Sequence, residues 1–215
     1  MKKIGLLLIV SLISFSSMAQ EKLLVGITGG TSYYMGDLNP TVPFNMPSPA
    51  FGAILKYPLN TRHVIRGSLL FGSLKGDDLT YNSDFYQRRA QSFSTSFVET
   101  NIQMEFNFME YAFDARKRSF TPYITAGLGY TIALGSSRYF NLPFGLGVKR
   151  TMSKRASAGI EWNFRKLFKD NMDGITNPGN DIYGSIFINN DWYSYAGIFV
   201  TYKLFDRPGD CPVYW

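Results

Sequence analysis

The chain contains one histidine, His63, and its surroundings bear on whether the sequence predicts an enzyme. Histidine is the side chain that acid–base catalysis uses most often. Hydrolases and acyltransferases would also need a nucleophile beside the ring and a carboxylate to orient it. His63 stands in the stretch NTRHVIR, where neither serine nor aspartate adjoins it. We therefore expect a structural histidine, no catalytic residues, and a protein that is not an enzyme.

Acidic residues gather in the polar stretches of the chain, where carboxylates could bind Ca²⁺ or bridge lipopolysaccharide through cations. Their spacing does not match an EF-hand loop, and aspartate is a common residue of solvated turns. We favour turn residues over a metal site. The sequence also lacks a P-loop, a dinucleotide glycine motif and a His/Cys metal cluster, so we expect no cofactor. The acids are Asp37, Asp77, Asp78, Asp84, Asp170, Asp173 and Asp181.

A regular alternation of side chains shows which elements must position the remaining polar residues. In the segment 121–134, TPYITAGLGYTIAL, Ile124, Leu128 and Leu134 share one face, while Thr125 and Gly127 share the other. Successive side chains of a strand point to opposite faces, so this segment has one apolar face and one small, polar face. Such strands are typical of a transmembrane β-barrel, with lipid outside and packed polar side chains inside.

Seven other segments alternate in the same way, which predicts an all-β, eight-stranded antiparallel transmembrane barrel of the outer-membrane type. Charged residues make up only 18% of the chain and aromatic residues 16%, which suits lipid exposure and interfacial aromatic girdles. The predicted strands are 23–35, 50–57, 63–74, 95–108, 121–134, 139–150, 155–165 and 192–205.

The first residues predict export from the cytoplasm. Lys2 and Lys3 precede an apolar run, and Ser17-Met18-Ala19 offers a cleavage site. We expect a cleavable signal peptide at 1–19, a barrel domain at 20–205, and a C-terminal tail at 206–215. Loops at 36–49, 75–94 and 166–191 are long, whereas 58–62 and 151–154 are short. Since outer-membrane barrels have long external loops and short periplasmic turns, we place both termini in the periplasm.

The inner face of the predicted barrel carries charges of both signs. An eight-stranded barrel has an interior just wide enough for side chains, so such charges should pair and fill it. We expect Glu105 and Glu161 each to find a basic partner, and we expect negligible ion conductance. The predicted network consists of Lys56, Arg66, Glu99, Glu105, Lys149, Glu161, Arg165 and Lys203.

The predicted periplasmic side is basic and ends in an aromatic tail. Pro208 and Pro212 prevent the tail from extending the last strand, and its apolar end is suited to an interface. Cys211 is the only cysteine, so no internal disulfide can form. Contact with lipid phosphates is an alternative to protein docking here. The candidate partner contacts are Arg116, Lys117, Arg118, Lys154, Arg155, Cys211, Tyr214 and Trp215.

Six segments of the chain, taken in order, form a distinctive set. They are SYYMGDLNP (32–40), YPLNTRHVIRGSLLFGSLKGDD (57–78), ETNIQMEFNFMEY (99–111), FTPYITAGLGY (120–130), LPFGLGVKRTMSKRASAGIEWNFRKLFKD (142–170) and NNDWYSYAGIFVTYKL (189–204). Together they resemble the PorG-like family of Bacteroidota, over nearly the whole mature chain. That resemblance implies an outer-membrane barrel subunit of the type IX secretion machinery, which is linked to gliding motility in some members. It also implies periplasmic ring partners, a lipoprotein and a soluble protein.

The sequence thus predicts a non-enzymatic outer-membrane barrel with membrane lipid as a partner. The resemblance implies that this barrel anchors periplasmic components of a type IX secretion or gliding machinery. We expect neither nucleic acid nor a small-molecule substrate as a ligand. A generic structural or adhesion barrel is the first alternative, and it would have external partners. A surface lipid-modifying enzyme is the second, and it would need a catalytic set on an external loop.

Overall fold

The computed structural model describes residues 23–35, 46–77, 92–111, 119–134, 138–168 and 192–204. The predicted signal peptide and C-terminal tail lie outside these residues. No helix in these ranges is long and apolar enough to cross a membrane. The strands are β1 (Leu24–Met35), β2 (Ser48–Pro58), β3 (His63–Asp77), β4 (Ser92–Asn107), β5 (Phe120–Ala133), β6 (Arg138–Thr151), β7 (Ala156–Leu167) and β8 (Trp192–Lys203).

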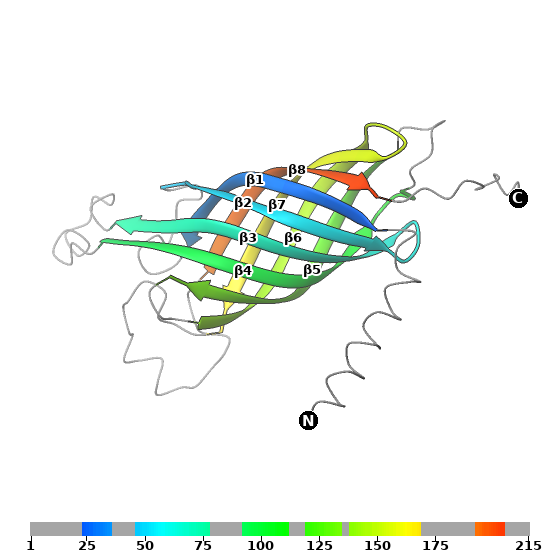
Figure 1. Cartoon of the computed structure of the whole chain (residues 1–215). Helices are drawn as coiled ribbons and strands as arrows, with labels where there is room; N and C mark the ends of the chain where they lie inside the picture. Colours follow the sequence, from blue (N-terminus) through cyan, green and yellow to red (C-terminus); the bar gives the residue numbers. More distant parts are fainter. Residues whose placement is uncertain are drawn as a thin grey trace, which may run out of the picture.

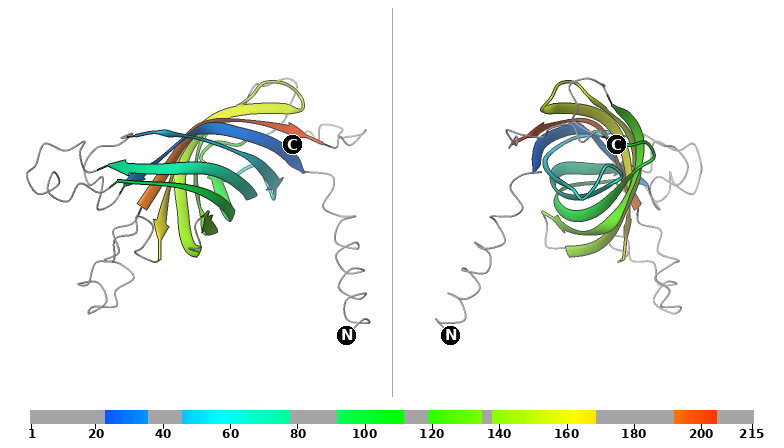
Figure 2. Two further views of the ribbon diagram at one scale, coloured as in Figure 1. Left: turned by 60° about the vertical axis from the view of Figure 1, so that its left-hand side comes forward. Right: turned by 90° about the vertical axis from the view of Figure 1, so that its right-hand side faces the viewer.

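The eight strands form one closed antiparallel barrel in which each strand pairs with its neighbours in the chain. The first and last strands close it, with pairs running from Leu24–Lys203 to Met35–Trp192. The predicted fold class is therefore confirmed, and each predicted strand overlaps an observed one. Figure 1 shows the strands of the front and back walls crossing obliquely, and the right-hand view of Figure 2 shows the strands curving into a ring. The hairpin of β3 and β4 is longer than predicted, since it reaches Asp77 and Ser92.

We name the two ends of the barrel by the strand ends that form them. The terminal rim is the end where β1 begins and β8 ends, and it includes the turns at 59–62 and 152–155. The far rim is the opposite end, where β1 ends and β2, β6 and β8 begin.

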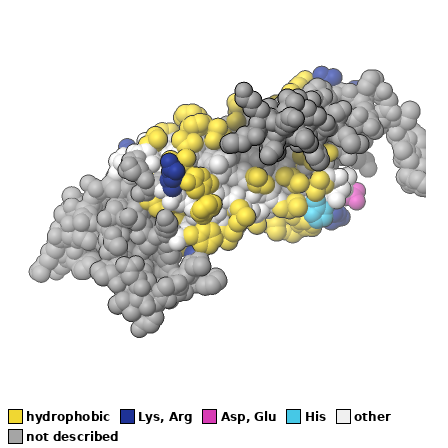
Figure 3. All heavy atoms as spheres, turned by 60° about the horizontal axis from the view of Figure 1, so that its bottom comes forward, with side chains coloured by type: hydrophobic (Ala, Val, Ile, Leu, Met, Phe, Trp, Pro, Cys, Tyr) yellow, Lys and Arg dark blue, Asp and Glu magenta, His cyan; other side chains and the backbone are white. Residues whose placement is uncertain are grey.

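Exposure alternates along the strands as a barrel with an apolar exterior requires. Every second residue of β6 is buried, from Tyr139 to Thr151, and the residues between them are exposed. Leu128, Ile102 and Ile198 are each more than 60% exposed, which is unfavourable in water and normal in a bilayer. Figure 3 shows apolar side chains spread along the wall of the barrel.

One residue of β1 departs from the alternation of exposed and buried side chains. Tyr33 has the parity of the lipid-facing side, opposite Ser194 in the register, yet its side chain is fully buried. The reason is a hydrogen bond on the outer wall: the indole Nε1 of Trp162 donates to the Tyr33 hydroxyl at 2.9 Å and to the Ser194 hydroxyl at 2.8 Å. The polar atoms of this outer cluster are therefore satisfied inside the apolar belt.

Candidate functional site: the filled lumen and the terminal rim

The first buried carboxylate lies toward the terminal rim and has two lysine partners. Lys56 Nζ of β2 donates to Glu105 Oε2 of β4 at 2.8 Å. Lys149 of β6 reaches the other oxygen, Oε1. The three side chains are each less than 5% exposed. Because both oxygens are engaged from opposite walls, Glu105 links three strands across the lumen.

The second carboxylate, Glu161 of β7, has an arginine partner. Arg66 of β3 donates from both terminal nitrogens, at 2.5 Å to Oε2 and 2.7 Å to Oε1. The Tyr123 hydroxyl donates to Oε2 at 3.1 Å. Such a bidentate contact fixes the orientation of the two side chains in addition to neutralising their charges. Glu161 stands between Gly147 and Gly197 in the register, which leaves room for its carboxylate.

The third carboxylate, Glu99 of β4, lies toward the far rim. Arg165 Nε of β7 donates to both of its oxygens, at 3.0 and 3.2 Å. The Asn101 amide donates to Oε1 at 2.5 Å, and the Tyr193 hydroxyl of β8 donates to Oε2. Each glutamate of the lumen is thus both paired with a cation and hydrogen-bonded, which is what a buried charge requires.

Aromatic rings complete the packing around the cations. Lys56 Nζ lies 4.3 Å from the centre of the Phe199 ring, and Lys149 Nζ lies 4.4 Å from that of Tyr111. Arg165 Cζ lies 5.7 Å from the centre of the Tyr193 ring and 5.4 Å from that of Tyr195. A desolvated cation over an aromatic face gains further stabilisation. Burial raises the pKa of the Tyr111 hydroxyl, so this residue stays neutral beneath Lys149.

A cluster of buried apolar side chains lies beyond the third carboxylate. It includes Tyr34, Leu74, Phe97, Tyr139 and Leu167, each 2% exposed or less. With the ion pairs below it, this cluster packs the described interior with side chains, consistent with the narrow interior of an eight-stranded barrel. The arrangement can hold charges rigidly.

The predicted lumen residues separate into two groups in the structure. Lys56, Arg66, Lys149 and Arg165 come together with the three glutamates. Lys203 has the same inward parity but lies half-buried at the terminal rim, where it pairs in the register with Leu24. The rings of Tyr123, Tyr193, Tyr195 and Phe199 were not predicted as partners. Their alternation in β5 and β8 would have placed them on the inner face beside the charges.

The single histidine of the chain, His63, contacts neighbouring side chains of the described structure. It begins β3 at the terminal rim, where its ring Nδ1 lies 3.2 Å from Asn60 Oδ1 and the ring packs edge-on against Phe106. In the parts of the chain that the structure describes, no group of three His, Cys, Asp or Glu residues is arranged to hold a metal ion.

The terminal rim has basic turns whose backbone is fixed by hydrogen bonds. In the β6–β7 turn, Met152 N donates to Ala156 O at 2.9 Å, and Ser153 Oγ accepts from the backbone of Arg155 and Ala156. Lys154 and Arg155 are both exposed on this turn. In the β2–β3 turn, Asn60 Oδ1 accepts the backbone N–H groups of residues 62 and 63 at 2.8 and 2.7 Å.

The same rim also exposes large apolar side chains beside its bases. Arg62 and Arg150 are exposed there, together with Leu59, Phe108 and Met152, the last at 62%. Tyr111 N donates to Thr61 O at 3.1 Å, which ties the segment after β4 to the β2–β3 turn. The other candidate contacts, Arg116, Lys117, Arg118, Cys211, Tyr214 and Trp215, lie outside the described residues, as do Asp37, Asp78, Asp84, Asp170, Asp173 and Asp181.

This geometry, with an apolar exterior and a salt-bridged interior, defines the class of outer-membrane β-barrels. A solved structure agrees on the fold. Neisserial surface protein A is similar with a TM-score of 0.54 at 13% identity, over 84% of this chain and 96% of that one. The attachment invasion locus protein Ail of Yersinia pestis is similar with a TM-score of 0.47 at 12% identity, over 85% of this chain and 98% of that one.

The sequence comparison gives the family. Residues 2–213 match the family described as "Domain of unknown function (DUF6089)", and the chain belongs to it. No curated protein sequence matches the chain.

Proposed function

We propose that this protein is a non-enzymatic anchor in the bacterial outer membrane, which holds periplasmic components of a type IX secretion or gliding machinery at the membrane. The observation that carries the proposal is the packed interior, in which Glu99, Glu105 and Glu161 are all buried and paired with cations. A barrel whose lumen is filled by its own side chains acts through its surfaces. The resemblance to the PorG-like family of Bacteroidota supports this particular machinery.

The proposal assigns the terminal rim to the periplasm. A signal peptide at 1–19 would direct export, and the barrel at 20–205 would leave both termini inside. Two of the three connections at the terminal rim are short, at 59–62 and 152–155, and three of the four at the far rim are long, which suits this orientation. The connections at 108–119 and 134–137 depart from this rule. The tail at 206–215, with Cys211, Tyr214 and Trp215, would then extend from the same rim as Lys154 and Arg155.

The terminal rim has properties suited to protein docking. Its turns are held in one conformation by the Asn60 and Ser153 hydrogen bonds, so little entropy is lost when a partner binds. Exposed Met152 and Leu59 supply apolar area, and Lys154 and Arg155 supply charge for an acidic partner surface. We propose the ring proteins, a lipoprotein and a soluble protein, as these partners.

Co-purification tests the proposal. The tagged full-length chain would be expressed in its native bacterium and recovered from gently solubilised membranes, and its partners would be identified by mass spectrometry. We expect periplasmic ring proteins with the unaltered chain, and their loss from K154E/R155E or from a chain lacking 206–215. The matched control is K75E, because Lys75 is an exposed base of the far rim.

The outcome separates this role from that of a surface barrel. Neisserial surface protein A is by its name a surface protein. If the present chain had such a role, its partners would be external, and K75E would disturb them more than K154E/R155E. Recovery of external partners alone, or of the ring proteins in full from both K154E/R155E and the tail deletion, would contradict docking at the terminal rim.

A further inference from the structure

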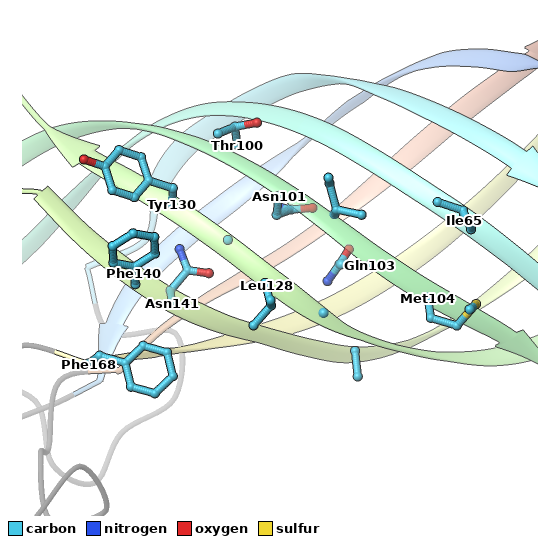
Figure 4. A pocket seen from close by; sticks show the side chains of 14 residues that line it. Ile65, Thr100, Asn101, Gln103, Met104, Leu128, Tyr130, Phe140, Asn141 and Phe168 are labelled. Carbon is cyan, nitrogen blue, oxygen red and sulfur yellow. The ribbon is translucent and has the colours of Figure 1, made fainter. Parts of the chain in front are cut away.

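The outer wall of the barrel contains an apolar groove of about 1040 Å³ across β4, β5 and β6. Tyr130, Phe140 and Phe168 stand at its end toward the far rim, and Ile65 and Met104 at the other end (Figure 4). The side chains that form its apolar floor and walls include Ile102 and Leu128.

Small residues and a break in the sheet explain why the wall is hollowed here. Thr100 and Ala126 are the outward residues paired with Tyr130 and Met104, so large side chains stand beside small ones. The β5–β6 pairing stops at Ala126–Phe144 and resumes at Gly129–Asn141. Pro143 lies in this gap, and proline has no backbone N–H to donate to a ladder.

In the described part of the chain, a cation without an ion pair stands at the far-rim end of the groove. Arg138 is the first residue of β6, exposed on the outer face, and two residues before Phe140 of the groove, a spacing of about 7 Å along a strand. In the described ranges of the chain, its guanidinium has no hydrogen bond or ion pair. Arginine binds phosphate through two parallel N–H groups, so a phosphate near the membrane surface is a fitting ligand.

We propose that this wall binds one membrane lipid with an anionic phosphate headgroup, which places an acyl chain in the groove and its phosphate on Arg138. The lengths agree. The groove runs along β4 from Thr100 to Met104, which is about 13 Å of strand. One leaflet contributes about 15 Å to the hydrocarbon core of a bilayer. A chain held along the groove therefore reaches the middle of the membrane from a phosphate at the far rim.

Native mass spectrometry of the full-length barrel in mild detergent tests the site. The probes are phosphatidylglycerol and phosphatidylcholine with the same acyl chains, each titrated against the protein. We expect tighter retention of phosphatidylglycerol, and R138Q should weaken it about tenfold, the effect of losing one charge-assisted contact. K75Q is the matched control, because Lys75 is another exposed, unpaired base of the far rim in the described ranges.

The groove itself needs a separate variant. A126L adds bulk on its floor and should weaken retention of both lipids, whereas A53L, at an exposed outward position of β2 outside the groove, should not. Unchanged retention of both lipids by A126L would overturn the proposal that the groove holds an acyl chain. Equal losses of phosphatidylglycerol in R138Q and K75Q would overturn a specific contact with Arg138, because general surface charge would then explain the binding. Displacement of phosphatidylglycerol by millimolar inorganic phosphate would overturn a lipid site, since a free ion would then suffice. Folding of each variant is checked by its heat-modifiable migration on a gel.

Discussion

Removing Arg66 would strand the buried carboxylate of Glu161, and the structure allows the cost to be worked out. The variant R66M keeps a side chain of similar length and removes the charge. Among the described residues, Glu161 then loses hydrogen bonds of 2.5 and 2.7 Å and retains only that from Tyr123 at 3.1 Å. Both residues of the pair are 3% exposed or less, so water does not replace the lost donors.

Two effects set the expected change in the free energy of unfolding. A hydrogen bond to a charged group contributes about 1.5–3 kcal/mol, and breaking a buried ion pair costs about 3–5 kcal/mol. A small gain opposes this cost, because Arg66 stands directly opposite Lys56 in the β2–β3 register. Like charges in facing positions destabilise a sheet by up to about 1 kcal/mol. We therefore expect R66M to lower the free energy of unfolding by about 3–4 kcal/mol.

The assay is urea-induced unfolding of the barrel in lipid vesicles, followed by tryptophan fluorescence and by heat-modifiable migration on gels. The double variant R66M/E161Q removes both charges and should recover most of the loss, because residue 161 then carries no buried charge without its partner. The control is Q103M, since Gln103 faces Arg66 in the register and its amide nitrogen has no partner in the described structure. A loss below about 1 kcal/mol in R66M, or a double variant as unstable as the sum of its parts, would refute the reasoning.

The remaining predictions concern the two faces of the wall. Leu128 is 68% exposed at mid-strand, so L128R should cost about 2–4 kcal/mol in vesicles, whereas M152R in an exposed turn should cost less than about 1. T125R should destabilise the barrel for a different reason, because the larger side chain would crowd the lumen around Asn163. Equal stability of L128R and the unaltered chain would show that the two faces of the wall are assigned wrongly. G147A should cost about 1–3 kcal/mol, because a Cβ there would lie 2.7 Å from the Tyr123 ring and from Ile160 O. G67A meets only Asn101 O at 4.0 Å and should change little, so an equal effect of both glycine variants would contradict a packed lumen.

The strand pattern could be predicted because alternation is a local property. In β6, Tyr139 is buried and its neighbour Phe140 is exposed, because successive side chains of an extended chain point to opposite faces of the sheet. The same parity sorts Glu99, Glu105 and Glu161 to the interior and Leu128 to the exterior. An open sheet of these strands would leave two unpaired edges, and the sequence predicts no other element to cover them. Closing the sheet into a barrel removes both edges.

The partners of each charge could not be predicted, because they lie across the lumen and not along a strand. Lys56 and Arg66 are neighbours in the register, yet Lys56 pairs with Glu105 on β4 and Arg66 pairs with Glu161 on β7. These choices depend on the stagger of the strands and on rotamers, which no local pattern encodes. The burial of Tyr33 likewise depends on Trp162, 129 residues away in the chain.

Electrical recording from the purified protein in planar bilayers tests the filled lumen most directly, and the anchoring role rests on that feature. The ion pairs of Glu99, Glu105 and Glu161 and the apolar cluster beyond them predict that the unaltered chain gives no stable single-channel steps. Stable, reproducible steps from correctly folded protein would show an open path through the barrel, and would contradict an account in which the protein acts only through its surfaces.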